Sequence, residues 1–457
     1  MESALLSLLC FDVGSTFTKA ALVDEDDGTL VAHRDTPTTL AGDVLDGIRT
    51  VAADLAAGGH RVPELGDRDR VLACSSAGGG LRLAVVGYER QVTAEAGHRV
   101  GLSAGASVVH VAAGRLGPAD VDALSAARPD LVLLVGGTDG GNAEVLLHNA
   151  GRLASRRLGV PVVVAGNAEA RQEVGASLAR TGRRFFLTDN VLPRIGVVAP
   201  GPARSAIREV FLRHVIGGKG LSRGPAFRQL VRAATPDAVL TGVEVLSDAS
   251  GEDVMVVDVG GATTDVYSVI TAAGEDATLR KEVVATLWHA RTVEGDLGMR
   301  WSAPGVLDAA RAEGLVVPDE QCLRDWVDRV HLDPGRLPRD AVEVEFDLTL
   351  ARLAVVVAVR RHARPDTPGG RPRPLVDLAR LIGSGGVLRH ASPAAAATVL
   401  TAVLHDHGGG WRPPAAAHPA VDTAYLLFVA GLLADEHPGL ARAAAAQMAA
   451  LPGDQPV

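Results

Sequence analysis

The feature that most constrains this chain is an eight-residue motif that occurs twice, far apart in the sequence. Asp12-Val-Gly-Ser-Thr-Phe-Thr-Lys19 aligns without a gap on Asp258-Val-Gly-Gly-Ala-Thr-Thr-Asp265, and four of the eight positions are identical. Each copy follows one apolar run and precedes another, so each predicts a strand, a tight glycine turn and a second strand. Two half-molecules that open with the same hairpin are therefore expected.

The composition of the two turns is typical of phosphate-binding loops. Glycine lets backbone N–H groups approach phosphate oxygens without a Cβ in the way, and neighbouring hydroxyl groups add donors. Lys19 is one of only three lysines in an arginine-rich chain, which favours a point-charge contact to a terminal phosphate. The candidate phosphate-binding residues are Gly14, Ser15, Thr16, Thr18, Lys19, Gly260, Gly261, Thr263 and Thr264.

An aspartate stands at the end of the first strand in each copy. Asp12 and Asp258 are candidate catalytic residues and candidate ligands of Mg²⁺, because Mg²⁺ binds few carboxylates and keeps much of its water. A strand that ends in Asp-Val-Gly without binding any ligand is the structural alternative. The repeat in register favours the phosphate interpretation over that alternative.

Between the two hairpins the sequence has a different pattern. Short apolar runs alternate with segments of helical periodicity, at residues 108–112, 131–135, 160–165 and 185–188. Such a series predicts right-handed crossovers and a parallel sheet covered by helices. Polar and glycine residues follow the runs at residues 136–142, 166–167 and 189–190. Ligands often bind at that edge of a sheet, although the same residue types are also common in turns and helix caps.

After residue 270 the pattern becomes mostly helical, with the clearest helices expected at residues 348–364, 391–405 and 421–435 and an exposed link at residues 365–374. A third glycine-rich turn, at Gly383, Ser384, Gly385 and Gly386, precedes the helix expected at residue 391. A backbone without side chains there would let an adenosine lie flat against it. An ordinary turn from strand to helix is the alternative.

These patterns predict three regions. Residues 1–100 form the first half with the first phosphate hairpin, and residues 101–235 form an inserted βαβ region. Residues 236–457 form the second half, with the second phosphate hairpin and the glycine turn for adenosine.

In their order, the two hairpins and the late glycine turn resemble those of the superfamily of acetate and sugar kinases, heat-shock chaperones and actin. Within it, the chain resembles the MutL (GlmL) family of glutamate mutase accessory proteins, which is unrelated to the mismatch-repair protein of the same name. The expected fold is α/β, a duplicated actin-like (ribonuclease H-like) ATPase fold with an inserted parallel βαβ region. The matching stretches are residues 11–19, 74–80, 132–142, 258–265, 292–300 and 383–386, with a weaker match at residues 430–434.

The resemblance implies an accessory factor that binds MgATP between two lobes and uses hydrolysis to release damaged cobalamin from an adenosylcobalamin-dependent mutase. It also implies that Asp258 orients the attacking water or the metal and that the Gly383 turn contacts adenosine. Chaperone relatives have a Glu-Pro pair in the helix that enters the second half, whereas this chain has Thr235-Pro236-Asp237. The resemblance therefore assigns no residue of this chain to the role of the chaperones' catalytic glutamate.

Glu294 and Asp296 are further candidates for contacts to the ribose or the metal. They lie in a glycine-rich segment that is expected to open a helix. A solvated helix start, where the dipole favours acidic residues, is the alternative. His405 and His407 resemble a pair of metal ligands but lack further ligands nearby, so no metal site is predicted there. Cys74 lacks an identified base, so it is not predicted to act as a nucleophile.

Two other functions remain open for the same motifs. A small-molecule kinase would pass the γ-phosphate to a hydroxyl or carboxylate instead of water. A nucleotide-gated interaction protein would bind ATP without turnover, and the missing Glu-Pro pair is the reason to consider it.

Charge and cysteine content narrow the class of partner. The net charge of −9 and the lack of a long basic run argue against a nucleic-acid or anionic-membrane surface. Three widely separated cysteines fit reduced thiols, and the longest apolar run falls short of the roughly 18 residues that a membrane span needs. We therefore expect a cytoplasmic protein. The resemblance implies that its partner is a set of mutase subunits, and the sequence leaves its oligomeric state open.

Overall fold

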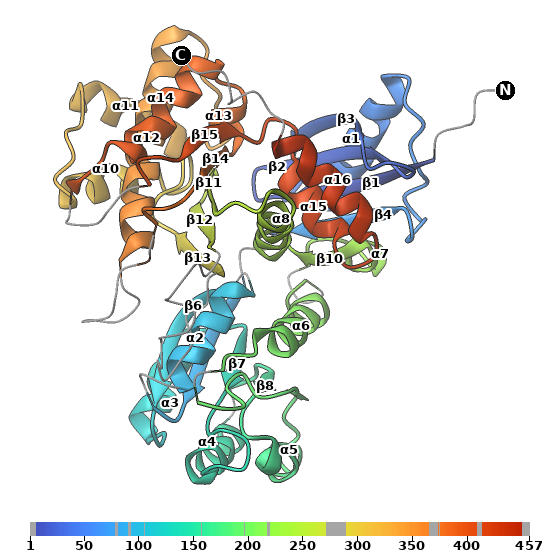
Figure 1. Ribbon diagram of the computed structural model, residues 1–457, viewed down its shortest axis with the longest axis vertical. Coiled ribbons are helices and arrows are strands. Elements are labelled where there is room, and N and C mark those ends of the chain that lie inside the picture. Colours follow the sequence, from blue (N-terminus) through green and yellow to red (C-terminus); the bar gives the residue numbers. More distant parts are fainter. Residues whose placement is uncertain are drawn as a thin grey trace. The chain divides into compact units, whose positions relative to one another are not determined.

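The computed structural model describes residues 6–77, 81–89, 93–104, 106–156, 158–195, 197–216, 220–270, 289–364, 373, 375–408 and 414–449. The chain divides into two compact units (Figure 1). Unit 1 comprises Met1–Ala77, Ala238–Thr271 and Arg291–Val457, and unit 2 comprises Gly78–Asp237 and Ala272–Ala290. No helix among the described residues has the length and apolar character needed to cross a membrane.

The first half of unit 1 is built on the predicted hairpin. β1 is buried along its whole length, which is why its sequence is a continuous apolar run up to Asp12. β1 pairs antiparallel with β2 and parallel with β4, so four of the strands in this sheet follow the order β4-β1-β2-β3. The elements are β1 (Ser7–Val13), β2 (Phe17–Asp24), β3 (Leu30–Pro37), α1 (Val44–Ala57) and β4 (Val71–Ser75).

The second half of unit 1 repeats this arrangement. β11 pairs antiparallel with β12 and parallel with β14, in the order β13-β12-β11-β14-β15. The central strand of each sheet therefore carries its aspartate between an antiparallel and a parallel neighbour. The strands are β11 (Val254–Val259), β12 (Thr264–Val269), β13 (His289–Glu294), β14 (Arg380–Ser384) and β15 (His418–Val421).

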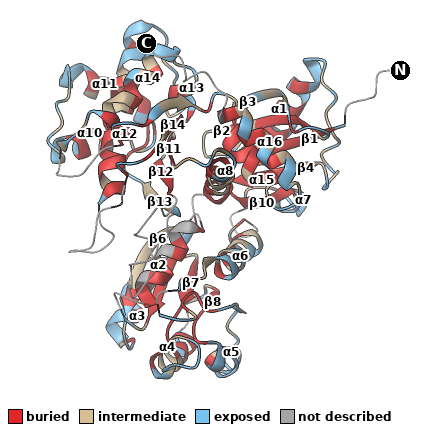
Figure 2. Ribbon diagram, in the orientation of Figure 1, coloured by how far each residue is buried: buried red, intermediate tan, exposed pale blue. Residues whose placement is uncertain are grey.

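Helices accompany both sheets of unit 1, and the long α12 packs on β11 and β12 with most of its residues buried (Figure 2). It begins where Asp340 accepts hydrogen bonds from the first turn of backbone N–H groups. The helices are α8 (Thr235–Ser250), α10 (Ala303–Ala312), α11 (Glu320–Leu332), α12 (Ala341–Ala363), α13 (Gly386–Arg389), α14 (Pro393–Leu404), α15 (Leu426–Leu433) and α16 (Pro438–Ala449).

Unit 2 contains the predicted parallel sheet. Its strands are all parallel and follow the order β6-β5-β7-β8-β9. The strands are β5 (Arg82–Gly87), β6 (Ser107–Ala113), β7 (Leu131–Leu134), β8 (Val162–Val164) and β9 (Phe185–Leu187), and β10 (Val231–Ala234) follows them in the chain. The helices are α2 (Thr93–Ser103), α3 (Pro118–Ala126), α4 (Glu144–Ser155), α5 (Arg171–Ala179), α6 (Pro200–Val210) and α7 (Ala226–Leu230), with a 3₁₀ turn (Ala168–Ala170) and a π-helical turn (Phe211–Ile216).

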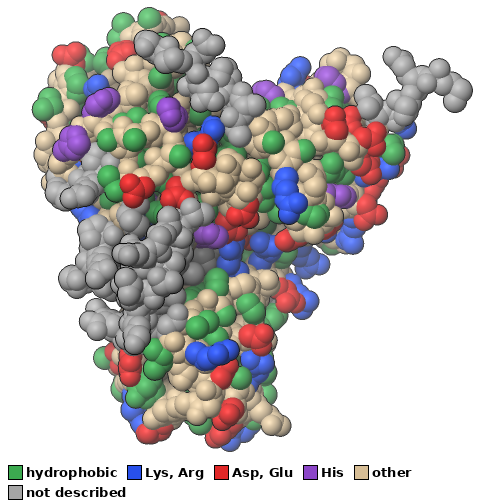
Figure 3. All heavy atoms as spheres, in the orientation of Figure 1, with side chains coloured by type: hydrophobic (Ala, Val, Ile, Leu, Met, Phe, Trp, Pro, Cys, Tyr) green, Lys and Arg blue, Asp and Glu red, His purple; other side chains and the backbone are tan. Residues whose placement is uncertain are grey.

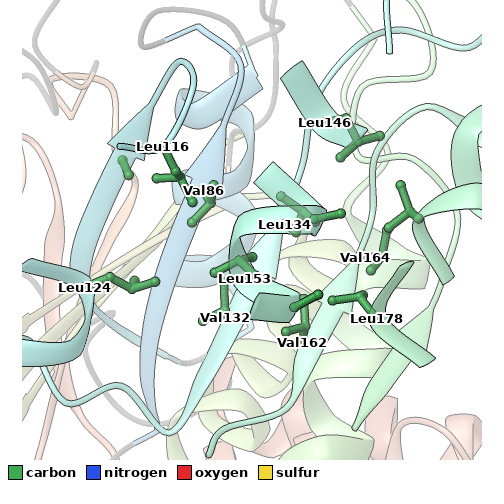
Figure 4. Close-up of a cluster of buried hydrophobic side chains, with 14 of the residues drawn as sticks. Val86, Leu116, Leu124, Val132, Leu134, Leu146, Leu153, Val162, Val164 and Leu178 are labelled. Atoms are coloured by element: carbon green, nitrogen blue, oxygen red, sulfur yellow. The ribbon is translucent and has the colours of Figure 1, made fainter. Parts of the chain in front are cut away.

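The core of unit 2 lies between this sheet and its helices. Apolar side chains of β5, β7 and β8 meet those of α3, α4 and α5, as Figure 4 shows for Val86, Leu134 and Val164 with Leu153 and Leu178. Burial of such β-branched and leucine side chains is the main stabilising term in an α/β layer. On the face drawn in Figure 3, acidic and basic side chains both occur over the described surface.

The α/β class, the duplication and the inserted parallel region are confirmed by these topologies. Several details differ from the prediction: strands β3, β4, β5, β10, β13 and β15 were not among those expected, and the helix expected at residues 421–435 is β15 followed by the shorter α15. Unit 2 starts ahead of residue 101 because β5 belongs to the parallel sheet and α2 packs on it. Residues 78–80 of the stretch at 74–80 lie outside the described residues, as does the link at 365–374 apart from Arg373.

Candidate functional site

The first hairpin closes through a tight turn at Gly14. Its N–H donates to the Phe17 carbonyl at 3.0 Å, and a Cβ on Gly14 would lie only 2.9 Å from that oxygen. The turn therefore needs a glycine for a steric reason inside the protein. Ser15 and Thr16 form its half-buried tip.

The second hairpin closes in the same way at Gly260. Its N–H donates to the Thr263 carbonyl at 2.9 Å, and a Cβ on Gly260 would lie 3.0 Å from that oxygen. The carbonyl groups at the tip accept backbone N–H groups of Met299 and Arg300, so the loop that follows β13 holds this hairpin in place. Thr263 lies half-buried at the tip.

The two hairpins meet at their tips within unit 1. A Cβ on Gly261 would lie 2.8 Å from Oγ1 of Thr16, so glycine at this position allows the approach. Oγ1 of Thr16 is buried and has no hydrogen-bond partner in the described part of the chain. A buried hydroxyl without a partner is costly, which indicates that this hydroxyl is available to a ligand.

In the first hairpin the aspartate is neutralised by a lysine. Asp12 lies opposite Lys19 in the β1–β2 register, and Nζ of Lys19 lies 2.7 Å from Oδ2 of the buried Asp12. Burial alone would lower the pKa of Lys19, but the carboxylates of Asp12 and Asp258 raise it above its ordinary value. Lys19 therefore stays protonated at the site.

In the second hairpin the aspartate faces another carboxylate. Asp258 lies opposite Asp265 in the β11–β12 register. Burial raises the pKa of Asp258, and the charges of Asp265 and Asp12 add to this against the opposing effect of Lys19 and Arg389. Oδ2 of Asp265 is held by the buried Arg291 at 3.1 Å, whereas its Oδ1 is buried without a hydrogen-bond partner among the described residues.

Two of the predicted phosphate donors have partners inside the protein instead. Thr18 and Thr264 occupy equivalent repeat positions and are both fully buried. Oγ1 of Thr18 hydrogen-bonds Oγ1 of Thr38 at 3.0 Å, and Oγ1 of Thr264 donates to the Leu297 carbonyl at 2.5 Å. Their hydroxyl groups brace the hairpins, and the half-buried tip hydroxyls of Ser15, Thr16 and Thr263 remain as candidate donors.

The late glycine turn lies beside the second hairpin. Ser384 at the end of β14 is the parallel partner of Asp258, which brings this turn to the acidic pair. A Cβ on Gly383 would lie 2.6 Å from Leu388 Cδ1, and one on Gly385, where φ is 104°, would overlap the Val259 carbonyl. A Cβ on Gly386 would meet open space, so packing does not explain this glycine.

The structure corrects the expected helix start at Glu294 and Asp296, whereas their contact to ribose or metal stays a prediction. Glu294 ends strand β13 rather than opening a helix, and the next helix, α10, begins at Ala303. The carboxylates of Glu294 and Asp296 both accept from Nη1 of Arg361 at 2.7 Å. This ion-pair cluster fixes α12 to the end of β13, which gives both carboxylates a structural role.

Residues that the sequence left unassigned also lie at the site. The guanidinium of Arg389, at the end of α13, stacks on the ring of Tyr425, with 3.4 Å from Cζ to the ring centroid. Nζ of Lys19 lies 5.6 Å from the same centroid. Arg389 follows the glycine turn closely, but Tyr425 is remote in sequence, and no local pattern links the two.

Other candidates have structural explanations. The polar edge of the unit 2 sheet is internally satisfied: Asn190 donates to Gly137 and Asp139, and Asn167 donates to Gly141. Cys74 lies buried within β4. Nδ1 of His405 lies 2.8 Å from the Thr401 carbonyl, and no group of three or more His, Cys, Asp or Glu arranged for a metal occurs among the described residues.

The segment Thr235-Pro236-Asp237 opens α8, as expected for its position in the chain. Asp237 is buried, and its Oδ2 lies 2.6 Å from Nε of Arg208. This carboxylate is neutralised by a protein partner, which argues against a role in activating water.

Comparison with known proteins places these features in a family. A sequence model of the family described as MutL protein matches residues 8–448. The curated Protein MutL of Clostridium tetanomorphum is 33% identical over 460 residues, which cover 94% of this chain and 96% of the relative.

Likeness to solved structures is distant. Nucleotide-free acetone carboxylase, in a structure on ATP-dependent acetone carboxylation, has a TM-score of 0.40 and 13% identity, covering 94% of this chain and 70% of its own. An ATP-dependent caprolactamase from Pseudomonas jessenii has a TM-score of 0.35 and 16% identity, covering 86% of this chain and 67% of its own. No residue role follows from similarity at this level.

Proposed function

Because the chain belongs to the MutL protein family, we propose that it is an ATP-dependent accessory factor that reactivates an adenosylcobalamin-dependent mutase of the glutamate mutase type. MgATP would bind between the two halves of unit 1, with its phosphates at the hairpin tips and its adenosine at the open side of Gly386. The observation that carries the proposal is the meeting of two equivalent glycine hairpins at Thr16 and Gly261.

The tip groups supply the donors for the phosphates. Ser15, Thr16 and Thr263 lie half-buried at the two tips, and the hydroxyl of Thr16 has no partner among the described residues. Such loops bind phosphate oxygens through backbone N–H groups and hydroxyls. Lys19, kept protonated by the carboxylates beside it, would add a positive charge.

The acidic groups suit a hydrated Mg²⁺. Mg²⁺ usually takes one or two carboxylates with water and substrate phosphates, so it does not need a cage of protein ligands. Asp258 and Asp12 would hold the ion through water, and its bound charge would offset the negative charge of the phosphates. Oδ1 of Asp265, which has no hydrogen-bond partner among the described residues, adds an acceptor for such a water.

Asp258 would position the water that attacks the terminal phosphate. Its carboxylate ends β11 beside the tip of the second hairpin, and its raised pKa makes it a better proton acceptor than an ordinary aspartate. The start of α8 has Thr235-Pro236-Asp237 in place of the Glu-Pro pair of the chaperones, and Asp237 is neutralised by Arg208. We therefore expect slow hydrolysis, which suits a factor whose nucleotide state acts on a partner.

The decisive experiment measures ATP hydrolysis with and without a cobalamin-dependent mutase that carries an inactive cobalamin. Wild type is expected to hydrolyse ATP, to be stimulated by the inactive mutase and to restore its activity. Asp258→Ala and the isosteric Asp258→Asn should lower the rate about a hundredfold or more, because an oriented catalytic group is lost. Asp54→Asn, at an exposed position of α1, is the matched control and should leave the rate unchanged.

The other two functions give different results in the same assay. A small-molecule kinase would produce a phosphorylated acceptor, whereas release of inorganic phosphate alone counts against it. An interaction protein without turnover would bind ATP but hydrolyse it at a near-zero rate, which Asp258→Ala would not change. The observation that favours this alternative is the neutralised Asp237 at the start of α8. Wild type that neither binds MgATP nor restores the mutase would exclude the proposal.

A further inference from the structure

We propose that Arg389 is the cation with which the second half binds the terminal phosphate of the nucleotide, held ready for it by the ring of Tyr425. This inference rests on the proposed function, since it requires a nucleoside triphosphate between the two halves of unit 1. It assigns a specificity for triphosphate over diphosphate to a residue outside the hairpins.

The two hairpins differ in the charge that faces each aspartate. Lys19 lies opposite Asp12, whereas Asp265 lies opposite Asp258. The second hairpin therefore contributes no cation of its own, and three carboxylates gather where an anionic phosphate chain would bind. The nearby Arg291 is 2% exposed and engaged with Asp265, so it cannot turn toward a ligand.

Arg389 has the unused hydrogen-bonding capacity that this role needs. Its Nη2 donates to the Asp422 carbonyl at 3.2 Å, and its Nε is buried without a hydrogen-bond partner within the described part of the chain. No carboxylate among the described residues forms an ion pair with it at 4.0 Å or less. A guanidinium with free donors in a fixed plane is well suited to a phosphate.

The position of Arg389 points to the phosphates rather than to the adenosine. It shares the ring of Tyr425 with Lys19, the cation of the first hairpin. Its positive charge opposes the rise in the pKa of Lys19 and of Asp258, so it acts on the charged groups of both hairpins. Arg389 also lies on the first turn of chain after Gly386, beside which there is open space.

Tyr425 is fixed firmly enough to act as a platform. It precedes α15 with φ of 63°, an uncommon conformation for a residue with a side chain, and Asp422 caps that helix through the N–H groups of Leu426 and Leu427. The phenol donates to Oδ1 of Asp35 at 3.1 Å, and burial raises the pKa of Tyr425 to about 12, which keeps this donor protonated.

The helix behind the platform is also held rigidly. A Cβ on Gly242 of α8 would overlap the Leu427 carbonyl of α15, so the backbones of the two helices touch. The chain passes at Tyr425 from β15, in the second sheet, to α15, which packs on β1 and β4 of the first. The ring thus holds Arg389 at the junction of the two halves.

The test compares the affinities for MgATP and MgADP, measured by calorimetry on the full chain. Arg389→Met keeps much of the bulk and removes the charge. It should weaken ATP binding about ten- to a hundredfold, the size of one lost charge-assisted hydrogen bond, with a much smaller effect on ADP. Arg389→Lys should recover part of the ATP affinity, and Arg49→Met, at an exposed position of α1, is the matched control.

A second variant separates positioning from charge. Tyr425→Leu removes the platform and leaves Arg389 in place, so it should lower the preference for ATP less than Arg389→Met does. Equal weakening of ATP and ADP binding by Arg389→Met, or no weakening, would overturn the inference while ATP binding by wild type still supports the proposed function. Wild type that binds no ATP would instead refute the proposed function itself.

Discussion

The two hairpins of unit 1 share the same backbone turn but differ in the charges that face their aspartates. Both close through a glycine N–H bonded to the carbonyl three residues later, and both place an aspartate between an antiparallel and a parallel strand. The neighbours of Asp12 are Lys19 and Cys74, whereas those of Asp258 are Asp265 and Ser384. The turn is preserved because its geometry is required, while the flanking charges have diverged.

This difference indicates that the two halves have different roles at the site. The first hairpin carries a neutralised ion pair, which suits a fixed phosphate contact. The second carries two facing carboxylates, one of them with a raised pKa, which suits proton and water chemistry. Each of the following changes tests whether the halves are equivalent or distinct at one point of the site.

The largest effect on stability is expected from Asp265→Asn. The change leaves the buried Arg291 without its carboxylate, and breaking a buried pair in this way costs about 3–5 kcal/mol in the free energy of unfolding. Urea denaturation measures the cost. Adding Arg291→Met to Asp265→Asn should recover part of it, because the uncompensated charge is then removed as well.

If Asp265→Asn lowered the free energy of unfolding by less than about 1 kcal/mol, the range of an exposed pair, the result would contradict a buried ion pair in the second hairpin. Asp46→Asn is the matched control, because it removes the carboxylate of an exposed pair with Arg49 on α1.

The next effect concerns the shared turn. Gly14→Ala places a Cβ 2.9 Å from the Phe17 carbonyl oxygen, and Gly260→Ala places one at nearly the same distance, 3.0 Å, from the Thr263 carbonyl oxygen. Both should lower the free energy of unfolding by a similar amount, about 1–3 kcal/mol, because the turn must open to admit the methyl group. Thermal or urea denaturation of the two variants side by side provides the measurement. A large cost in one hairpin and none in the other would show that the turns are not equivalent.

A smaller effect is expected at Gly261, where the hairpins touch. Gly261→Ala would bring a methyl group against Oγ1 of Thr16, 2.8 Å away, and should weaken MgATP binding by separating the tips. Thr16→Ala removes that oxygen, so the double variant should bind better than Gly261→Ala alone, with a coupling of about 0.5–3 kcal/mol. If the effects of Gly261→Ala and Thr16→Ala on MgATP affinity were simply additive, the two tips would not be in contact.

Local chemistry explains what the sequence could predict. Glycine turns between apolar runs fix the hairpins, and continuous apolar runs mark the buried strands of unit 2, so the duplicated α/β fold with its insert followed from patterns of a few residues. β13 and β15 were missed because most of their residues are only partly buried, so no apolar run marks them. Of the candidate site, the hairpin residues that meet and the charges of Lys19, Asp12 and Asp258 follow from the motif, whereas the charges of Asp265 and Arg389 beside them were not assigned.

The missed site residues depend on contacts between distant segments. Arg389 and Tyr425 meet only because α13 and the start of α15 are brought together by the second sheet. Glu294 and Asp296 were assigned to a helix start because glycine and acidic residues are common there, whereas Arg361 from α12 accounts for both carboxylates. Thr18 and Thr264 match a phosphate loop in sequence, and only their burial shows that they serve the hairpins themselves.

The smallest expected effect is on the pH dependence of stability, because opposing charges partly cancel at Asp258. Its pKa is raised in the folded protein by burial and by Asp265 and Asp12, against Lys19 and Arg389. The stability that Asp258 contributes is therefore present below its unfolded pKa and is lost as pH rises through its folded pKa. The side chain of Asp258→Asn cannot ionise. As pH rises through this range, the free energy of unfolding of the variant should therefore increase relative to that of wild type, and the difference should stay constant at higher pH. Urea denaturation of both proteins from acid to neutral pH checks the sign. A wild type that gains on the variant as pH rises would mean that the cations at the site, and not the facing carboxylate, dominate the second hairpin.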